Sequence, residues 1–149
     1  MPEMNVHLKF VLPSHPRFLS VARATVAELG SVYGLSAEEC RRIALAVDEA
    51  MANVIRHAYH GAFDGAIELN CQVWKDRLEF TLLDQGECPD PARLAPHPLD
   101  SVALSGRGTH IMRTVMDEVC YEKVPGGNQL RLCKRLRPAE SAAADEGEK

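Results

Sequence analysis

The chain has 149 residues, of which 46% are hydrophobic and 26% are charged, which is the composition of an ordinary globular domain. Its formal net charge of −4 offers no basic surface for nucleic acid, so direct binding to DNA or RNA is not expected. No apolar run is long enough to span a membrane, and the first ten residues lack the apolar segment of a signal peptide, so a cytoplasmic protein without a membrane partner is expected.

The first half of the chain predicts one strand followed by two helices. Apolar and polar residues alternate over Met4–Leu12, which is the pattern of a half-buried strand. Helical spacing follows over about Pro16–Tyr33. Ser36 and Glu39 have the spacing of a capping box, so a second helix is expected from there to about Tyr59. One face of this second helix is apolar and should face the core; it carries Ile43, Val47, Ala50, Val54 and Ala58.

The second half predicts two pairs of adjacent strands with one helix between them. Adjacent strands with short links favour antiparallel hairpins, and a Gly-Gly pair is a strong hairpin turn. The expected fold class is therefore α+β, a two-layer sandwich of a mostly antiparallel sheet with helices on one face. The expected segments are strands over Ala66–Trp74 and Leu78–Asp84, a loop over Gln85–Ser105, a helix over Gly108–Asp117, a strand over Val119–Val124, a turn at Gly126-Gly127 and a strand over Gln129–Leu136.

The length and the C-terminal composition predict a single domain. A chain of 149 residues falls within the usual size of one domain, and residues 1–137 contain all the periodic segments. Residues 138–149 are small and charged, which is typical of a disordered tail.

Glu49 and Asn53 stand four residues apart on the second expected helix and therefore share one face of it, at the rim of the core. A carboxylate in this place can accept a proton, and an amide oxygen is a ligand that Mg²⁺ accepts. On this pair alone, a solvated helix face with two ordinary polar residues is the favoured interpretation.

Two glycine-containing motifs lie further along the chain. Asp84-Gln85-Gly86 ends a strand, where the carboxylate can accept a hydrogen bond from an exocyclic amine and the glycine allows a planar ring to approach. Gly106-Arg107-Gly108 precedes a helix, whose first N–H groups and positive dipole end can bind phosphate. Each motif taken alone is better explained as an ordinary turn or loop.

Histidines and cysteines do not predict a transition-metal site. His57 and His60 are three residues apart and Cys71 follows, but no second pair of ligands has the spacing of such a site, so two polar imidazoles at a helix end are the favoured interpretation. The cysteines are odd in number and lack CxxC spacing, which favours reduced thiols over a disulfide framework. They are Cys40, Cys71, Cys88, Cys120 and Cys133.

Taken in order, a helix with Glu and Asn, a strand ending in Asp-x-Gly, and a Gly-x-Gly before a helix resemble the GHKL ATPases, with their histidine-kinase-like ATPase domain or Bergerat fold. More narrowly, the sequence resembles the stand-alone anti-sigma-factor serine/threonine kinases of bacteria. The resemblance covers about residues 5–136. The similar segments are Leu45–Tyr59 to the N-box, which carries most of the specificity, Asp84–Gly86 to the adenine-binding box, Gly106–Met112 to the glycine-rich phosphate segment and Gly127–Lys134 to the closing strand.

The resemblance implies a role for each matching residue. Glu49 would be the general base that acts on a substrate hydroxyl, and Asn53 would ligate Mg²⁺ bound to the ATP phosphates. Asp84 would accept a hydrogen bond from the adenine amino group, and Gly86 would make room for the ring. The residues implied at the phosphates are Arg56, Gly106, Arg107, Gly108 and Thr109.

The resemblance also implies an activity and partners. The activity is that of an ATP-dependent serine/threonine protein kinase that phosphorylates a small antagonist protein of the STAS type. The kinase would hold a sigma factor inactive in a partner switch that regulates transcription. A phosphatase-linked signalling module and a homodimeric state are implied in the same way.

Two features favour a different class, a nucleotide-gated protein-binding module without phosphotransfer. Many members of the family have a second glycine in the adenine-binding box where this chain has Cys88. The loop from Glu87 to Ser105 is also short for a full ATP lid. The intact pair of Glu49 and Asn53 favours the enzyme, so the sequence leaves both alternatives open.

Overall fold

The computed structural model describes residues 4–87 and 104–136, with the backbone alone for residues 4, 5 and 104–109. The helices and strands follow one another in the order that the sequence predicts. They are β1 (Met4–Pro13), the 3₁₀ turn η1 (Pro16–Phe18), α1 (Leu19–Val32), α2 (Ala37–Asn53), the π-helical turn η2 (Val54–Ala58), β2 (Ala66–Trp74), β3 (Arg77–Asp84), α4 (Leu104–Val115), β4 (Glu118–Val124) and β5 (Gly127–Arg135). None of the helices in these ranges combines the length and the apolar character that crossing a membrane requires.

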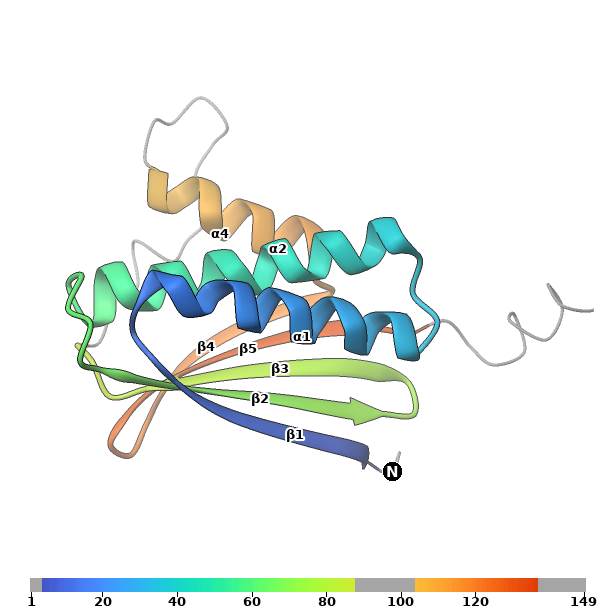
Figure 1. The fold of residues 1–149 in the computed structure, drawn as a ribbon, viewed down its shortest axis with the longest axis horizontal. Coiled ribbons are helices and arrows are strands. Elements are labelled where there is room, and N and C mark those ends of the chain that lie inside the picture. Colours follow the sequence, from blue (N-terminus) through green and yellow to red (C-terminus); the bar gives the residue numbers. More distant parts are fainter. Residues whose placement is uncertain (1–3, 88–103, 137–149) are drawn as a thin grey trace, which may run out of the picture.

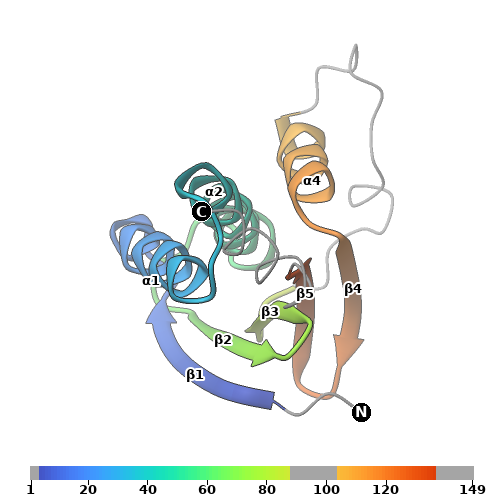
Figure 2. The ribbon, with the colours of Figure 1, turned by 90° about the vertical axis from the view of Figure 1, so that its right-hand side faces the viewer.

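The five strands form one sheet in the order β1-β2-β3-β5-β4, and every neighbouring pair is antiparallel. Strands β2 and β3 form one hairpin and β4 and β5 another, as the short links predict. The three long helices all lie on the same face of the sheet, α1 and α2 side by side and α4 next to α2 (Figure 1). Figure 2 shows that α4 covers the part of the twisted sheet that contains β4. The predicted α+β two-layer sandwich is therefore confirmed.

The core lies between the helix layer and the covered face of the sheet. Period-two alternation turns Ile67, Leu69 and Leu82 toward the helices, and all three are fully buried. Their partners come from the apolar stripe of α2 and η2, whose members are all buried as predicted. These are Ile43, Val47, Ala50, Val54 and Ala58.

Helix α2 begins where its local sequence predicts. The Ser36 hydroxyl accepts a hydrogen bond from the Glu39 N–H at 3.1 Å, and the Glu39 carboxylate accepts one from the Ser36 N–H at 3.2 Å. Just before this capping box, Gly34 has φ +89°, a left-handed conformation that ends the preceding helix at little cost. Gly34 and Ser36 thus separate α1 from α2 by local chemistry alone.

The second predicted helix is α-helical only to Asn53 and continues as the π turn η2 to Ala58, and two further predicted boundaries are wrong. The third long helix was expected over Gly108–Asp117 but spans Leu104–Val115, so the glycine-rich segment belongs to its first turns and not to a loop before it. The second hairpin turns at Pro125 and Gly126, because Gly126 has φ +83° while Gly127 already pairs with Val124. Proline followed by a glycine with positive φ is the sequence preference of a type II turn, which explains the shift by one residue.

Candidate functional site

The two polar residues predicted on α2 lie at the rim of the core, one turn apart. Glu49 and Asn53 are both half-buried, whereas Ala50 between them is fully buried. This burial pattern agrees with the predicted rim position. The helix therefore presents a carboxylate and an amide along one edge.

The helix changes its geometry immediately after Asn53. The Tyr59 N–H bonds the carbonyl of Val54, five residues back, at 3.1 Å, which defines the π turn η2. The segment then ends at His60, with φ +52°, and Gly61, with φ +80°. Single π turns of this kind occur often at functional sites, because they rotate the helix face that follows them.

The amide oxygen of Asn53 is already engaged. The Arg56 guanidinium donates to Asn53 Oδ1 at 2.6 Å; Arg56 is exposed, whereas Asn53 is half-buried. The residue expected to hold Mg²⁺ and the residue expected to reach a phosphate are thus in contact with each other. A cation that uses Asn53 Oδ1 must share this oxygen with Arg56 or displace it.

Asp84 is buried at the end of β3 and only 4% exposed. Its Oδ1 accepts hydrogen bonds from the Gly86 N–H at 3.0 Å and from Asn128 Nδ2 at 2.9 Å. Burial raises the pKa of Asp84 above its usual range, and these two hydrogen bonds oppose the rise. No hydrogen bond from the described residues reaches Oδ2, so this oxygen remains available as an acceptor.

Three consecutive amides after Asp84 are all hydrogen-bonded, and two of them tie this segment to the end of the helix. The Gln85 N–H donates to the Tyr59 hydroxyl at 3.0 Å, the Gly86 N–H donates to Asp84, and the Glu87 N–H donates to the Ala58 carbonyl at 2.9 Å. The Tyr59 hydroxyl itself donates to the carbonyl of Ala66 at 2.6 Å. A fixed backbone therefore connects β3 to η2.

Gly86 has a structural requirement of its own. A Cβ atom there would lie 2.4 Å from the Ala58 carbonyl oxygen, which is a backbone atom that has no room to move. The close approach of this loop to η2 therefore needs glycine at this position. Its predicted role in admitting a planar ring stays a prediction beside this packing role.

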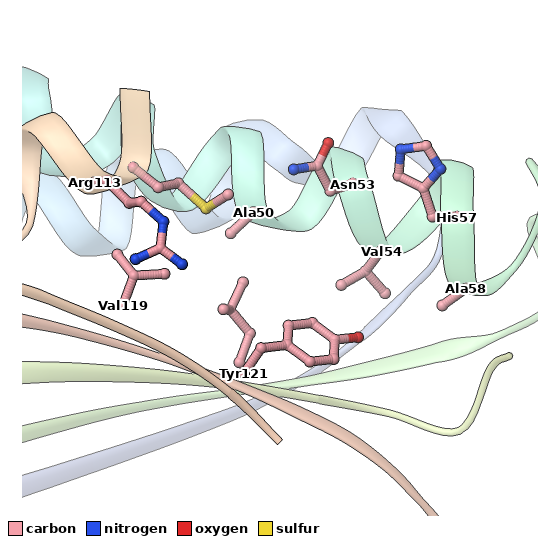
Figure 3. A pocket seen from close by; sticks show the side chains of 10 residues that line it. Ala50, Asn53, Val54, His57, Ala58, Arg113, Val119 and Tyr121 are labelled. Atoms are coloured by element: carbon pink, nitrogen blue, oxygen red, sulfur yellow. The ribbon is translucent and has the colours of Figure 1, made fainter. Parts of the chain in front are cut away.

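One pocket lies between the helix layer and the sheet, beside Asn53 (Figure 3). Its walls come from α2, η2, α4, β4 and β5 and are mostly apolar, with few polar side chains. In Figure 3, Ala58 and His57 stand at one end of the pocket and Arg113 stands at the other, near Ala50. The lining residues are Ala50, Asn53, Val54, His57, Ala58, Met112, Arg113, Val119, Tyr121 and Leu130. Mostly apolar pockets with a few polar groups are the usual form of small-ligand sites.

The predicted phosphate segment lies next to this pocket, on α4. Gly106, Arg107, Gly108 and Thr109 occupy the first turns of that helix, and the pocket-lining residue Met112 follows on the same helix. The side chains of Arg107 and Thr109 lie outside the described part of the structure, as does the whole of Cys88. Their phosphate role therefore stays a prediction.

The histidines near the helix end have separate surroundings. His60 Nε2 contacts Glu87 Oε2 at 2.5 Å at the surface, and His57 lines the pocket. Cys71 is fully buried in the core, and burial raises the pKa of its thiol to about 12. Within residues 4–87 and 104–136, the structure contains no cluster of three or more potential metal ligands among His, Cys, Asp and Glu.

Two residues at the site were missed by sequence reasoning. Asn128 faces Asp84 across the β3–β5 pair, and Arg113 lines the pocket from α4. The closing strand was recognised by its similarity to a family segment, but only the strand register shows that Asn128 meets Asp84. Arg113 follows the glycine-rich segment by helical spacing, which alone does not predict the direction of its side chain.

Comparison with known proteins decides the family. The model of the histidine kinase-like ATPase domain matches residues 12–134 of the chain. The chain belongs to this family. Within the histidine kinase-like ATPase domain, the pocket lies beside the N-box helix, which is formed by α2 and η2. The buried Asp84 lies at the end of β3.

The relatives of this ATPase domain include several serine-protein kinases named RsbW. The chain is 30% identical to that of Bacillus velezensis over 128 residues, which cover 80% of each protein. It is 33% identical to that of Bacillus pumilus over 122 residues, which cover 75% of each protein.

A solved structure shares the fold of this ATPase domain. The structure of the RsbU and RsbW domains of Rv1364c from Mycobacterium tuberculosis matches with a TM-score of 0.64 and 18% identity. The match covers 90% of this chain and 34% of that one, so the chain spans about a third of the solved protein. At this identity the comparison supports the fold alone.

Proposed function

We propose that the protein is a cytoplasmic, ATP-dependent serine kinase that phosphorylates a small antagonist protein. The observation that carries the proposal is the pocket lined by Asn53 and Ala58, because the Ala58 carbonyl also holds the loop that follows the buried Asp84. The relatives named serine-protein kinase RsbW, which match over most of their length, support the same reaction class.

In this proposal Asp84 recognises the base. Its Oδ1 is held by Gly86 and Asn128, which orients the carboxyl group and leaves Oδ2 for the adenine amino group. Because the loop backbone is fixed by its hydrogen bonds to η2, the acceptor is in place before the nucleotide arrives.

Asn53 would hold Mg²⁺ beside the phosphates. A half-buried amide oxygen at the pocket rim suits a hard cation that keeps several of its waters. The chemistry that a bound Mg²⁺ supplies is neutralisation of phosphate charge. Arg56 would exchange its hydrogen bond to Asn53 for one to a phosphate oxygen, while Gly106, Arg107, Gly108 and Thr109 would contact the phosphates from α4.

Glu49 would act as the general base. Its carboxylate takes the proton of the substrate serine as the serine oxygen bonds to the γ-phosphorus, and the bond from that phosphorus to the bridging oxygen breaks to release ADP. Glu49 stands one turn before Asn53, so the base and the expected metal ligand share one edge of α2. In this proposal the proton acceptor would lie beside the transferred group.

The proposed substrate is an antagonist protein of the STAS type, and the proposed second partner is a sigma factor. Phosphorylation adds a charge of about −1.5 to −2 to the antagonist, which weakens its docking through repulsion and desolvation. The sigma factor is then held by the kinase. A homodimeric kinase and a phosphatase-linked module that restores the antagonist complete the proposed partner switch.

One observation favours the alternative, a nucleotide-gated binding module without phosphotransfer. Arg56 occupies the Asn53 oxygen at 2.6 Å, and a persistent contact would keep Mg²⁺ from its expected ligand. The two functions differ in a simple assay. The module would bind ATP without transferring phosphate to a purified STAS-domain protein.

The test of the kinase proposal is the Glu49→Gln variant. Loss of the base should lower phosphoryl transfer to the STAS-domain protein by about 10²- to 10⁴-fold. Binding of ATP with Mg²⁺, measured by calorimetry, should change little, because Glu49 contacts the substrate proton and not the nucleotide. Glu38→Gln, an exposed change at the start of the same helix, is the matched control. Equal transfer rates for wild type and Glu49→Gln would refute the assignment of Glu49 as the base.

A further inference from the structure

We propose that Arg113 is a phosphate-binding residue of this site. It would act at the end of the pocket opposite the adenine of the nucleotide. The inference rests on the proposed nucleotide function and names a contact on α4 that lies outside the recognised motifs. It starts from the direction of one side chain. In Figure 3, Arg113 reaches from α4 into the space above Val119, between α4 and β4.

The described lining of the pocket offers Arg113 no compensating negative charge. The pocket that it lines contains no carboxylate, since its other described members are apolar or neutral polar residues and a histidine. Within the described part of the chain, the structure records no ion pair for Arg113. A guanidinium stays charged at physiological pH, so the exposed Arg113 at the rim of a mostly apolar pocket is suited to an anion.

The neighbouring carboxylates are engaged elsewhere. Asp117, one turn after Arg113, accepts a hydrogen bond from the Arg135 N–H at 2.6 Å. Glu118 lies 4.0 Å from the guanidinium of Arg131 on the neighbouring strand. Within the described part of the chain, neither carboxylate pairs with the Arg113 guanidinium, so its N–H donors can face a ligand.

The direction of the bound nucleotide follows from the positions of its fixed contacts. The loop after Asp84 is held against Ala58 by the Glu87 N–H, which donates to the Ala58 carbonyl, and by the close approach of Gly86, so the adenine belongs at the Ala58 end. From Ala58 back to Ala50 the helix axis extends roughly 12 Å, and Asn53 stands between them. A nucleotide with its base at Ala58 therefore directs its phosphates past Asn53 toward the Arg113 end.

This direction of the nucleotide predicts that the contribution of Arg113 to affinity increases with the number of phosphates. Arginine binds phosphate through paired N–H groups, which gives contacts that a neutral nucleoside does not offer. The terminal phosphate extends furthest toward Arg113, so ATP gains most from the contact, ADP less and adenosine nothing. Arg113 is in this view a residue that distinguishes the loaded from the spent nucleotide.

Calorimetric titration of the full chain with ATP, ADP and adenosine, each with Mg²⁺, tests the inference. For Arg113→Ala we expect affinity for ATP to fall by about 10- to 100-fold, affinity for ADP to fall less, and affinity for adenosine to stay unchanged. Arg113→Lys, which keeps the charge but loses the paired donors, should fall between the two. Arg41→Ala, an exposed arginine on the first half of α2, is the matched control.

The outcomes separate this inference from the proposed function. If wild type binds ATP and Arg113→Ala binds it equally well, the inference is wrong and the proposed function stands. If Arg113→Ala weakens ATP and adenosine alike, the residue only supports the fold of the pocket and the inference is equally wrong. If wild type binds no ATP with Mg²⁺, the proposed function is wrong, and the inference, which rests on it, is wrong as well. Arg113→Gln, which retains the apolar stem, gives the same comparison if the alanine variant does not fold.

Discussion

The two ends of α2 are built in different ways. At its start, the Ser36 and Glu39 side chains satisfy each other's backbone within three residues of sequence. At its end, the helix widens into η2, and the Ala58 carbonyl accepts a hydrogen bond from Glu87, far along the chain. One end is therefore defined by local chemistry and the other by contacts across the fold.

The difference shows where binding chemistry is placed in this domain. The locally defined end has only a structural role, because the two residues of a capping box satisfy each other's backbone hydrogen bonds. The end defined by distant contacts places the pocket residues Asn53 and Ala58 beside the loop that follows Asp84, because η2 and this loop hold each other. The site therefore depends on the distant contacts and not on the helix alone.

The strongest way to break this contrast is Gly86→Ala. The added Cβ would lie 2.4 Å from the Ala58 carbonyl oxygen, so the loop and η2 must separate. We expect a loss of about 3 kcal/mol in the free energy of unfolding, measured with urea, and loss of ATP binding. Gly34→Ala is the matched control: it lies in open space with φ +89°, and its cost should be about 1 kcal/mol with binding retained. Normal binding by Gly86→Ala would show that the close approach is not required.

A smaller effect is expected from Asn128→Ala, which removes one of the two described hydrogen bonds to buried Asp84. We expect a loss of about 2 kcal/mol at neutral pH, because the buried Asp84 carboxyl group loses one of its two described donors. The control is Gln129→Ala on the same strand, which should change stability by less than about 0.5 kcal/mol. Equal losses for the two variants would contradict the special role of Asn128.

The pH dependence of this effect has a definite sign. Burial raises the pKa of Asp84 in the folded state, so its protonated form favours folding. That contribution is fully present below the unfolded value of about 3.9 and is lost as pH rises through the folded pKa. Loss of the Asn128 donor should raise this pKa further. The cost of Asn128→Ala should therefore grow with pH through this window, and a flat profile would contradict the assignment.

The smallest effect is expected at the other end of the helix. Ser36→Ala removes half of the capping box and should lower the free energy of unfolding by about 1 kcal/mol, measured with urea. Binding of ATP should stay as in wild type, since the site lies at the opposite end of α2. Ser20→Ala on the exposed side of α1 should have almost no effect. A large change in ATP affinity for Ser36→Ala would show that the two ends are coupled.

The fold was predictable wherever a local pattern determines it. Strand alternation predicted β2 with its observed bounds, and the capping box predicted the first residue of α2. The start of α4 was missed, because two glycines within three residues weaken helical propensity although the structure continues the helix through them. Tertiary packing outweighs that local preference.

The site was predictable in its residue types but not in its connections. Spacing placed Glu49 and Asn53 on one edge of the helix, and the structure agrees. The contact of Arg56 with Asn53 and the pairing of Asp84 with Asn128 depend on rotamers and on strand register. Neither is encoded in the spacing of a single segment, so both required the structure.

The three consecutive amides of residues 85–87 have a consequence for the thermodynamics of binding. Each amide already has an acceptor in the protein before any ligand arrives, so the base side of the pocket has little conformational entropy left to lose. The ordering cost of nucleotide binding then falls on the opposite end, where exposed arginine side chains must give up rotamer freedom. Recognition of the base should therefore be close to rigid-body docking, and capture of the phosphates should be the step that carries the entropic penalty.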